Sequence, residues 1–271
     1  MAPGAALRVL PLPGTGGGLA RSLRMVERSV MVYRRRWPVL ASGAFEPLFY
    51  LLALGVGLGS LVGALPGPDG HPVRYVDFVA PAMLAAASMN GAIFDSTFNV
   101  YFKLRFDKVY DAALATPLTV GAVAVGEITW ALIRGGMYAA SFVVVLLVFG
   151  LIHSPWAVLA LPAALLIGFA FAGAGMACTT FMRSWQDFDY VTMVQIPLFL
   201  FSATFFPLDV YPGALRVLVE WTPLYQGVTL LRGLTLGGPG PALLGHAAYL
   251  LAMGLLGTAV TIRRLGRILL R

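Results

Sequence analysis

The chain alternates long apolar stretches with short charged segments. Six stretches are long and apolar enough to cross a membrane, since a spanning helix takes about 20 apolar residues. The third would be about 50 Å long if wholly helical, so we expect it to tilt, protrude or bend near Gly135 and Gly136. The fifth contains Pro197 and is barely long enough. The six predicted spans are residues 39–65, 78–100, 120–152, 155–182, 190–206 and 241–262.

Two further segments are apolar without the length of a simple span. In residues 19–37, Leu23, Val26 and Val30 share one helical face with Tyr33 and Trp37, while the arginines lie mostly elsewhere. This pattern predicts an amphipathic helix at the membrane interface. Residues 207–240 are largely apolar and broken by prolines, which predicts a re-entrant or interface-lying external helical hairpin. The fold class is therefore an all-α integral membrane protein with six transmembrane helices, preceded by a flexible segment, 1–18.

Composition supports a membrane protein. Of the 271 residues, 59% are hydrophobic and only 11% are charged, which is too few charged side chains for the surface of a soluble domain. One cysteine, Cys178, cannot form a disulfide within the chain. We find no cleavable secretion signal and no separate soluble domain, so residues 19–271 are expected to form a single transmembrane domain.

The charges predict the orientation, because positively charged loops stay in the cytoplasm. With both termini inside, 15 of the 19 Lys and Arg residues are cytoplasmic, and Arg74, Arg216 and Arg232 are outside. The net charge of +7 is therefore explained by topology and anionic lipid, without a nucleic-acid partner.

Motifs for catalysis or nucleotide binding are missing from the sequence. The Gly-rich run Gly14–Gly18 has no following GK[ST], and no GxSxG elbow is present. The histidines His71, His153 and His246 are scattered and do not have the spacing of a metal site. We expect no catalytic residue, metal or bound cofactor on this chain.

Two pairs of acidic residues leave open the possibility that the protein is a membrane transferase. Asp187 and Asp189 form a DxD, and Asp107 and Asp111 a DxxxD, patterns that bind metal-diphosphate groups in some membrane transferases. Both pairs are also consistent with solvated cytoplasmic loops. Because Asp107 and Asp111 alternate with basic residues, they are equally typical of a docking surface.

Four charged residues are predicted at membrane depth: Glu46, Asp95, Glu127 and Arg134. A charge near the bilayer centre costs about 2.5 to 3.5 kcal/mol, so these side chains should face protein or water. Glu127 and Arg134 are about 10 Å apart along one helix, too far to pair, so each needs a partner on another helix. They predict a polar translocation route or a subunit interface; the alternative is that charges near the cytoplasmic ends, such as Asp95 and Glu127, extend to the membrane surface.

Small residues recur every fourth position in two spans. They are Gly55, Gly59 and Gly63 in the first, and Ala164, Gly168 and Ala172 in the fourth. Such stripes permit close helix approach, within one subunit or between two.

The order of these features resembles the membrane subunit of type-2 ABC exporters. Residues 106–128, FDKVYDAALATPLTVGAVAVGEI, are similar to the coupling segment of that family, with Thr116 and Pro117 at its TP. Residues 45–59, FEPLFYLLALGVGLG, are similar to the first span of the nodulation-type branch, which exports lipo-oligosaccharides. Residues 201–234 resemble the external signature of the family, with matching residues Pro207, Pro212, Trp221, Pro223 and Arg232.

The resemblance implies a permease that dimerises in the bacterial inner membrane and binds two copies of a separate ATPase, which carries the ATP and magnesium. Its coupling loop would be residues 102–116, with Lys103, Arg105, Asp107, Lys108 and Asp111 contacting the ATPase. The implied cargo is a lipid-linked glycan, lipo-oligosaccharide or other amphiphile. Drug or antibiotic exporters of the family share this outline. A membrane transferase acting on a diphosphate-linked lipid, and a passive channel or structural subunit, are the alternatives of other classes.

Overall fold

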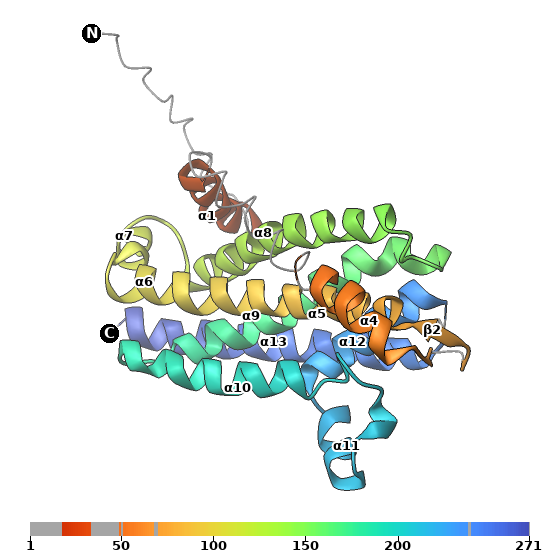
Figure 1. Cartoon of the computed structure of the whole chain (residues 1–271). Coiled ribbons are helices and arrows are strands. Elements are labelled where there is room, and N and C mark those ends of the chain that lie inside the picture. Colours follow the sequence, from red (N-terminus) through yellow and green to blue (C-terminus); the bar gives the residue numbers. More distant parts are fainter. Residues whose placement is uncertain (1–17, 34–48, 50, 68–69, 238–239, 271) are drawn as a thin grey trace.

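A computed structural model describes residues 18–33, 49, 51–67, 70–237 and 240–270. The described chain is mostly helical, with one short two-stranded antiparallel sheet (Figure 1). The elements are α1 (Gly18–Tyr33), η2 (Ala53–Leu58), α4 (Gly59–Val62), β1 (Ala64–Pro66), β2 (Pro72–Arg74), α5 (Tyr75–Phe94), η3 (Asp95–Asn99), α6 (Val100–Arg105), α7 (Val109–Leu114), α8 (Val120–Val148), η4 (Pro155–Leu159), α9 (Ala160–Thr179), η5 (Trp185–Asp187), α10 (Phe188–Leu200), η6 (Leu208–Val210), α11 (Gly213–Glu220), α12 (Pro223–Leu236) and α13 (Ala242–Leu269).

Four helical stretches in the described chain are long and apolar enough to cross a membrane. They are Tyr75–Arg105, Val120–Val148, Pro155–Thr179 and Ala242–Leu269. They correspond to the second, third, fourth and sixth predicted spans, and the last continues well beyond residue 262. The third is shorter than predicted, because its helix ends at Val148 and the chain turns at Gly150 with a φ of 64°.

The first and fifth predicted spans differ from expectation. In the first, residues 39–48 and 50, including Glu46, lie outside the described residues, and the helix ends at Val62 because Gly63 adopts a φ of 74° before β1. Residue 65 is thus a strand residue. In the fifth, α10 has 13 residues and ends at Leu200, three residues after Pro197, so residues 201–206 are not helical.

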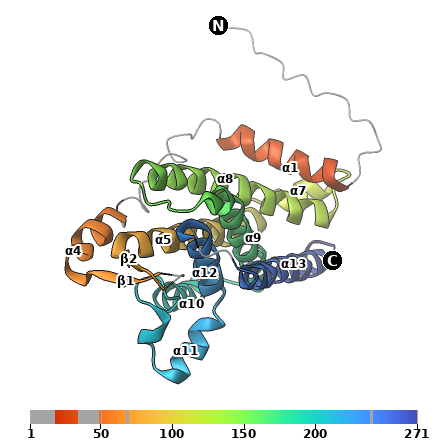
Figure 2. The same ribbon diagram turned by 90° about the vertical axis from the view of Figure 1, so that its right-hand side faces the viewer.

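The centre of the bundle is α9, which α5, α8, α12 and α13 surround (Figure 2). Its closest neighbour is α13, and glycines make that approach possible. A Cβ added at Gly173 would lie 2.6 Å from the Gly254 carbonyl oxygen, and one at Gly257 would lie 2.4 Å from the Gly173 backbone. The predicted stripe of Ala164, Gly168 and Ala172 is also buried, but the tightest contact lies further along α9.

The predicted N-terminal segment forms the helix α1, which packs lengthwise on α8 (Figures 1 and 2). Its place at the membrane interface stays a prediction. Met25 and Val26 are buried, and a Cβ at Gly126 would lie only 2.6 Å from the Met25 Cβ. Leu23 and Val30, expected on the same face as Val26, are instead exposed. The face that contacts protein is therefore rotated from the predicted one, and Leu23 and Val30 remain available for lipid.

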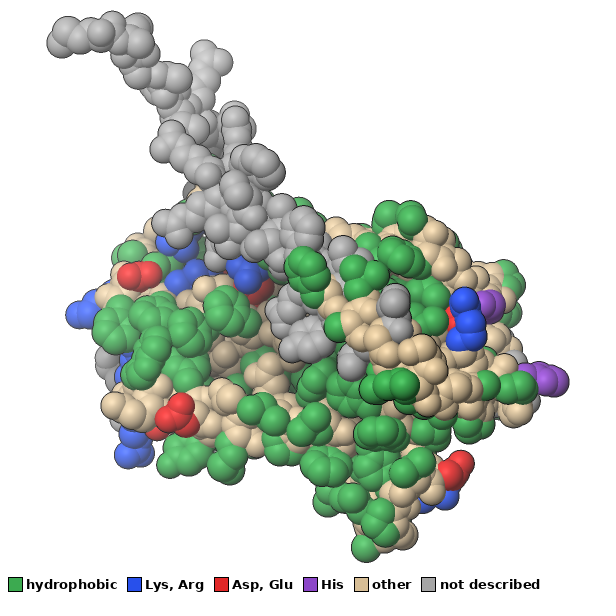
Figure 3. All heavy atoms as spheres, in the orientation of Figure 1, with side chains coloured by type: hydrophobic (Ala, Val, Ile, Leu, Met, Phe, Trp, Pro, Cys, Tyr) green, Lys and Arg blue, Asp and Glu red, His purple; other side chains and the backbone are tan. Residues whose placement is uncertain are grey.

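The two ends of the bundle differ in charge. The end formed by α6, α7 and the C-terminal part of α13 carries most of the Lys and Arg side chains visible on one face (Figure 3). The opposite end carries the β1–β2 hairpin and the turn at Gly150 (Figure 1). That the basic end is the cytoplasmic one stays a prediction from the sequence.

Candidate functional site

Two ion pairs connect the α5–η3–α6 helix with α8. Arg134 Nη2 lies 2.9 Å from Asp95 Oδ1, and Lys103 Nζ lies 2.7 Å from Glu127 Oε2. The Asp95 and Glu127 side chains are each 4% exposed. The expectation that Glu127 and Arg134 have partners on another helix is confirmed. The alternative, that Asp95 and Glu127 extend to the membrane surface, is wrong, because both carboxylates are buried inside the bundle.

The inner part of the network is built on a π-helical turn. Residues Asp95–Asn99 form η3, and Asn99 donates from Nδ2 to Asp95 Oδ1 at 2.5 Å. Thr179 of α9 donates its hydroxyl to the Ser96 carbonyl oxygen at 3.0 Å. π-turns carry an extra residue and are frequent at functional positions. The π-turn thus directs the Asp95 side chain toward Arg134 of α8, while the Ser96 carbonyl oxygen accepts a hydrogen bond from Thr179 of α9.

Tyr110 extends this network to the short helix α7. Its side chain is fully buried, and burial followed by the negative charge of Glu127 raises the pKa of its hydroxyl well above the usual value. Within the described chain, neither this hydroxyl nor Glu127 Oε1 has a partner at full hydrogen-bond geometry. Tyr110, Glu127 and Lys103 thus form one buried group that joins α7, α8 and α6.

The predicted coupling residues separate into two sets. Asp107, Lys108 and Asp111 are exposed around α7, and Lys108 has a left-handed backbone with a φ of 48°. Arg105 is exposed but donates to the Met182 carbonyl oxygen at 2.9 Å. Lys103 is turned inward to Glu127. The surface available to a partner is therefore Asp107, Lys108 and Asp111, supported from inside by Lys103 and Tyr110.

The acidic pairs do not gather into a metal site. Asp187 Oδ2 accepts hydrogen bonds from the backbone N–H groups of Arg183 at 2.6 Å and Ser184 at 3.1 Å. These bonds lower the pKa of the Asp187 carboxyl, and those with Ser184 form a capping box at the start of η5. Among the residues that the structure describes, no group of three or more His, Cys, Asp or Glu side chains could hold a metal ion.

Arg232 fastens the predicted external segment to the bundle. This buried side chain on α12 donates to the Phe78 carbonyl oxygen, at 3.2 Å from Nε and 3.1 Å from Nη2, and to the Ala203 carbonyl oxygen at 3.0 Å. Its guanidinium carbon lies 3.6 Å from the centroid of the Phe78 ring. Arg232 therefore holds together α12, the start of α5 and the turn after α10.

The other predicted external residues shape the hairpin. Pro207 and Pro212 directly precede η6 and α11, and Pro223 is the first residue of α12. Trp221, at the turn between the two helices, is 70% exposed. The short helix α11 projects from the side of the bundle (Figure 1). Residues 207–240 thus contain the helices α11 and α12, with Trp221 exposed between them, and their place as a re-entrant or interface-lying external hairpin stays a prediction.

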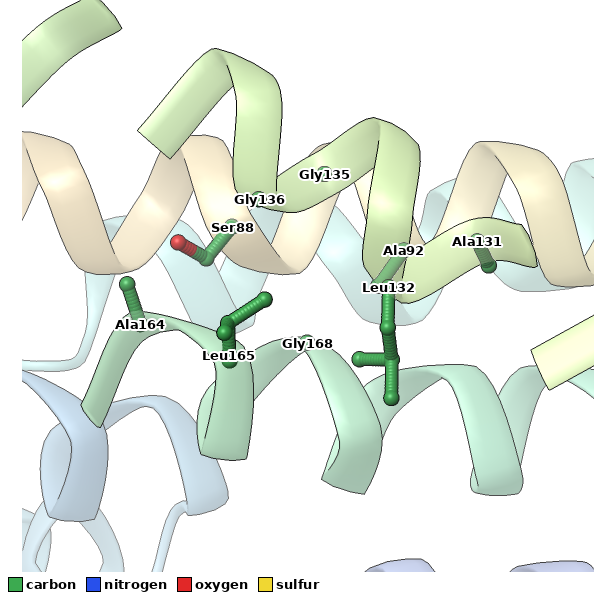
Figure 4. Close-up of a pocket in the computed structure, with 9 residues that line it drawn as sticks. All are labelled: Ser88, Ala92, Ala131, Leu132, Gly135, Gly136, Ala164, Leu165 and Gly168. Atoms are coloured by element: carbon green, nitrogen blue, oxygen red, sulfur yellow. The ribbon is translucent and has the colours of Figure 1, made fainter. Parts of the chain in front are cut away.

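A small cavity lies between α5, α8 and α9 (Figure 4). Its lining includes Ser88, Ala131, Gly135, Ala164 and Gly168. At about 10 Å³ it is near the lower limit for a single water molecule. It cannot hold an amphiphilic cargo.

Sequence reasoning missed Asn99, Tyr110 and the glycines of α13. Asn99 stands four residues after Asp95, a spacing at which helical side chains meet, and could have been found in this way. Tyr110 gave no signal, because a tyrosine in a charged loop is ordinarily exposed. Gly254 and Gly257 are three residues apart, whereas the stripes considered were four apart.

Comparison of the sequence with known proteins identifies the family of the chain. The model of the ABC-2 type transporter family matches residues 22–236, so the chain belongs to that family of membrane-spanning transport subunits.

Its curated relatives include nodulation protein J of Rhizobium leguminosarum bv. viciae, 32% identical over 227 residues that make up 82% of this chain and 86% of the relative. Nodulation protein J of Rhizobium leguminosarum bv. trifolii is 33% identical over 229 residues, 82% of this chain and 85% of the relative. Nodulation protein J of Rhizobium meliloti is 32% identical over 197 residues, 72% of each chain. The chain is thus an ABC-2 permease similar to nodulation protein J.

Proposed function

We propose that this permease exports a lipid-linked glycan, a lipo-oligosaccharide or another amphiphile across the bacterial inner membrane, driven by a separate ATPase. The observation that carries the proposal is the attachment of α7. Asp111 on α7 and Asp107 and Lys108 directly before it are exposed, while Tyr110 of α7 is buried beside Glu127. A surface helix that exposes charged residues and buries a side chain in the bundle can transmit movement imposed by a partner to the membrane-spanning helices.

The proposed path of that push follows the ion pairs. An ATPase that moves α7 would move Tyr110, which contacts the Lys103–Glu127 pair at the inner end of α8. The Asp95–Arg134 pair lies further along the same two helices, and η3 between the pairs also bonds α9. The two pairs would keep α5–η3–α6 and α8 moving together. ATP and magnesium would be bound by the ATPase, of which two copies are expected.

The route for cargo is proposed to lie between two permeases. The cavity between α5, α8 and α9 is too small, whereas α10 exposes much of its apolar side-chain surface. A second copy would cover that surface, and we expect a homodimer. Four helical stretches of the described chain are long and apolar enough to cross a membrane. Six crossings would need the predicted first span, part of which lies outside the described residues, and α10 as two more, and both termini would then be cytoplasmic. The exposed apolar side chains on α10 include Tyr190, Met193, Val194, Ile196 and Leu200.

The experiment is charge exchange on α7. Lys108→Glu combined with Asp111→Lys keeps the net charge and should not disturb the fold, because both side chains are exposed. We expect it to reduce co-purification of the ATPase and ATP-dependent export about tenfold or more. A matched control, Arg21→Glu on the exposed side of α1, reverses a basic charge elsewhere and should leave both unchanged. Full export with normal co-purification in the α7 variant would reject α7 as the coupling element.

A drug or antibiotic is a second candidate for the exported molecule, because other exporters of the same family share this outline. The resemblance of residues 45–59 to the nodulation-type branch and the relatives named nodulation protein J support a lipo-oligosaccharide. A drug or antibiotic would use the same coupling and spans. Export of a labelled lipo-oligosaccharide by inverted membrane vesicles, compared with export of an amphiphilic drug of similar size, separates the two.

A further inference from the structure

Four phenylalanines form a continuous ladder along the α5–η3–α6 helix. Phe94, Phe98, Phe102 and Phe106 follow one another at every fourth residue. Their successive ring centroids are 5.3, 5.5 and 5.3 Å apart, and the Phe94 and Phe98 rings are stacked with an interplanar angle of 10°. The π-turn η3 lies in the middle of this run.

Two aromatic side chains from the next segment extend the ladder. Trp185 of η5 packs edge-on against Phe98 and Phe102, with centroid distances of 5.2 and 5.6 Å. Phe188 of α10 lies 4.7 Å from Phe98. These six residues are called the aromatic ladder below, and their hydrophobic surface is visible near α6 in Figure 3. The ladder is not a closed core, because Phe94 is 50%, Phe106 63% and Trp185 51% exposed.

An amide pair stands at the end of the ladder that is further from α7. Gln195 of α10 donates from Nε2 to Asn90 Oδ1 of α5 at 2.8 Å. Asn90 lies four residues, about one helical turn, before Phe94, and Gln195 lies seven residues, about two turns, after Phe188. Each amide therefore shares a helix face with the ladder. Within the described residues, the Asn90 amide nitrogen and the Gln195 amide oxygen have no further hydrogen-bond partner.

This combination does not suit a surface that faces lipid. Hydrocarbon can cover phenylalanine rings, but it cannot bond an amide nitrogen or a carbonyl oxygen, and unsatisfied polar groups at membrane depth cost several kcal/mol. An acyl chain likewise would use the rings and leave the amides unbonded. A saccharide can contact both the aromatic rings and the amide groups, because the C–H faces of pyranose rings pack on aromatic rings and their hydroxyl or N-acyl groups form hydrogen bonds with amides.

We propose that the aromatic ladder and the Asn90–Gln195 pair form a binding site for the saccharide rings of the cargo. The site lies on the inner half of the α5–η3–α6 helix, next to α7. It rests on the proposed function, because it assigns the sugar part of the exported amphiphile to a surface beside the coupling element. Binding to the isolated permease, without ATPase or transport, tests the site separately from export.

The experiment measures binding of a β-1,4-linked glucose tetramer by equilibrium dialysis to the full-length permease in lipid nanodiscs. We expect saturable binding, weakened about fivefold or more by Trp185→Leu and by Phe98→Leu, since one aromatic contact is worth about 0.5 to 1.5 kcal/mol. Trp185→Tyr, which keeps a ring, should stay within about twofold of the unmodified protein. The matched control is Trp156→Leu, because Trp156 is also 51% exposed but lies in η4 at the other end of the bundle.

A second measurement on the unmodified protein avoids any folding defect of the variants. A 12-carbon alkyl chain that carries a photoreactive diazirine is crosslinked to the permease with and without the tetramer. We expect the tetramer to reduce labelling of the peptides that contain the ladder. The proposal is wrong if the tetramer shows no saturable binding, if Trp185→Leu and Phe98→Leu bind it as well as Trp156→Leu does, or if alkyl labelling of the ladder is strong and unaffected by the tetramer.

Discussion

The Asp95–Arg134 ion pair makes a quantitative prediction about the interior of the bundle. The two side chains are 4% and 9% exposed, and their charged atoms are 2.9 Å apart. At an effective dielectric constant of about 20, two unit charges at this distance attract by about 6 kcal/mol before the cost of desolvation. Removing one partner leaves the other buried and uncompensated, which typically costs about 3 to 5 kcal/mol.

The predicted perturbation is a double-mutant cycle. Arg134→Met alone should lower the apparent Tm by roughly 6 to 10 °C, at about 2 °C per kcal/mol for a chain of this size. Asp95→Leu combined with Arg134→Met replaces both charges by apolar side chains, and should be within about 2 kcal/mol of the unmodified protein. If Asp95→Leu alone also costs about 3 to 5 kcal/mol, the coupling energy of the two positions should be at least about 4 kcal/mol in magnitude.

The assay is thermal unfolding of the purified permease at one scan rate, paired with ATP-driven export in vesicles. We expect the double variant to recover folded protein but to export at about a tenth of the normal rate, because the pair is proposed to move α5 and α8 together. If Arg134→Met unfolds within 2 °C of the unmodified protein, the reasoning about the buried charge is refuted. If the double variant exports normally, the pair only stabilises the fold.

Three other substitutions test separate parts of the structure. Gly126→Val should displace α1 from α8, because even a Cβ would lie 2.6 Å from the Met25 Cβ, and increased protease cleavage within α1 measures this. Arg232→Lys should lower the free energy of unfolding by about 2 to 4 kcal/mol, nearly as much as Arg232→Met does, because an ammonium does not reproduce the planar contacts of the guanidinium to two carbonyl oxygens and a ring. Equal stability of Arg232→Lys and the unmodified protein would contradict this. Asp187→Ala with Asp189→Ala should leave export intact, whereas loss of a magnesium-dependent reaction on a diphosphate lipid would support the transferase alternative.

The long spans could be predicted from the sequence because a bilayer imposes a length and a composition. The stretches that became α5, α8, α9 and α13 were all found, with errors mainly at their ends. Those errors have local causes. The helix before β1 ends at a glycine with positive φ, and α10 ends shortly after Pro197, features that a count of apolar residues does not register.

The candidate site was only partly predictable. Counting charges at membrane depth located Asp95, Glu127 and Arg134, and the spacing of the last two correctly required partners on another helix. The ion-pair partner of each of these charged residues depends on how the two helices pack against each other, and this packing cannot be deduced from the sequence alone. Lys103 accordingly was assigned to the surface, although it faces Glu127.

The central claim is that this permease works only when a nucleotide-hydrolysing partner acts on α7. The most direct measurement is export of a labelled lipo-oligosaccharide by proteoliposomes that contain the permease alone, the permease with its co-purified ATPase, or the permease with an ATPase unable to hydrolyse ATP. The account predicts export only in the second preparation and only with ATP. Equal export by the permease alone would contradict it.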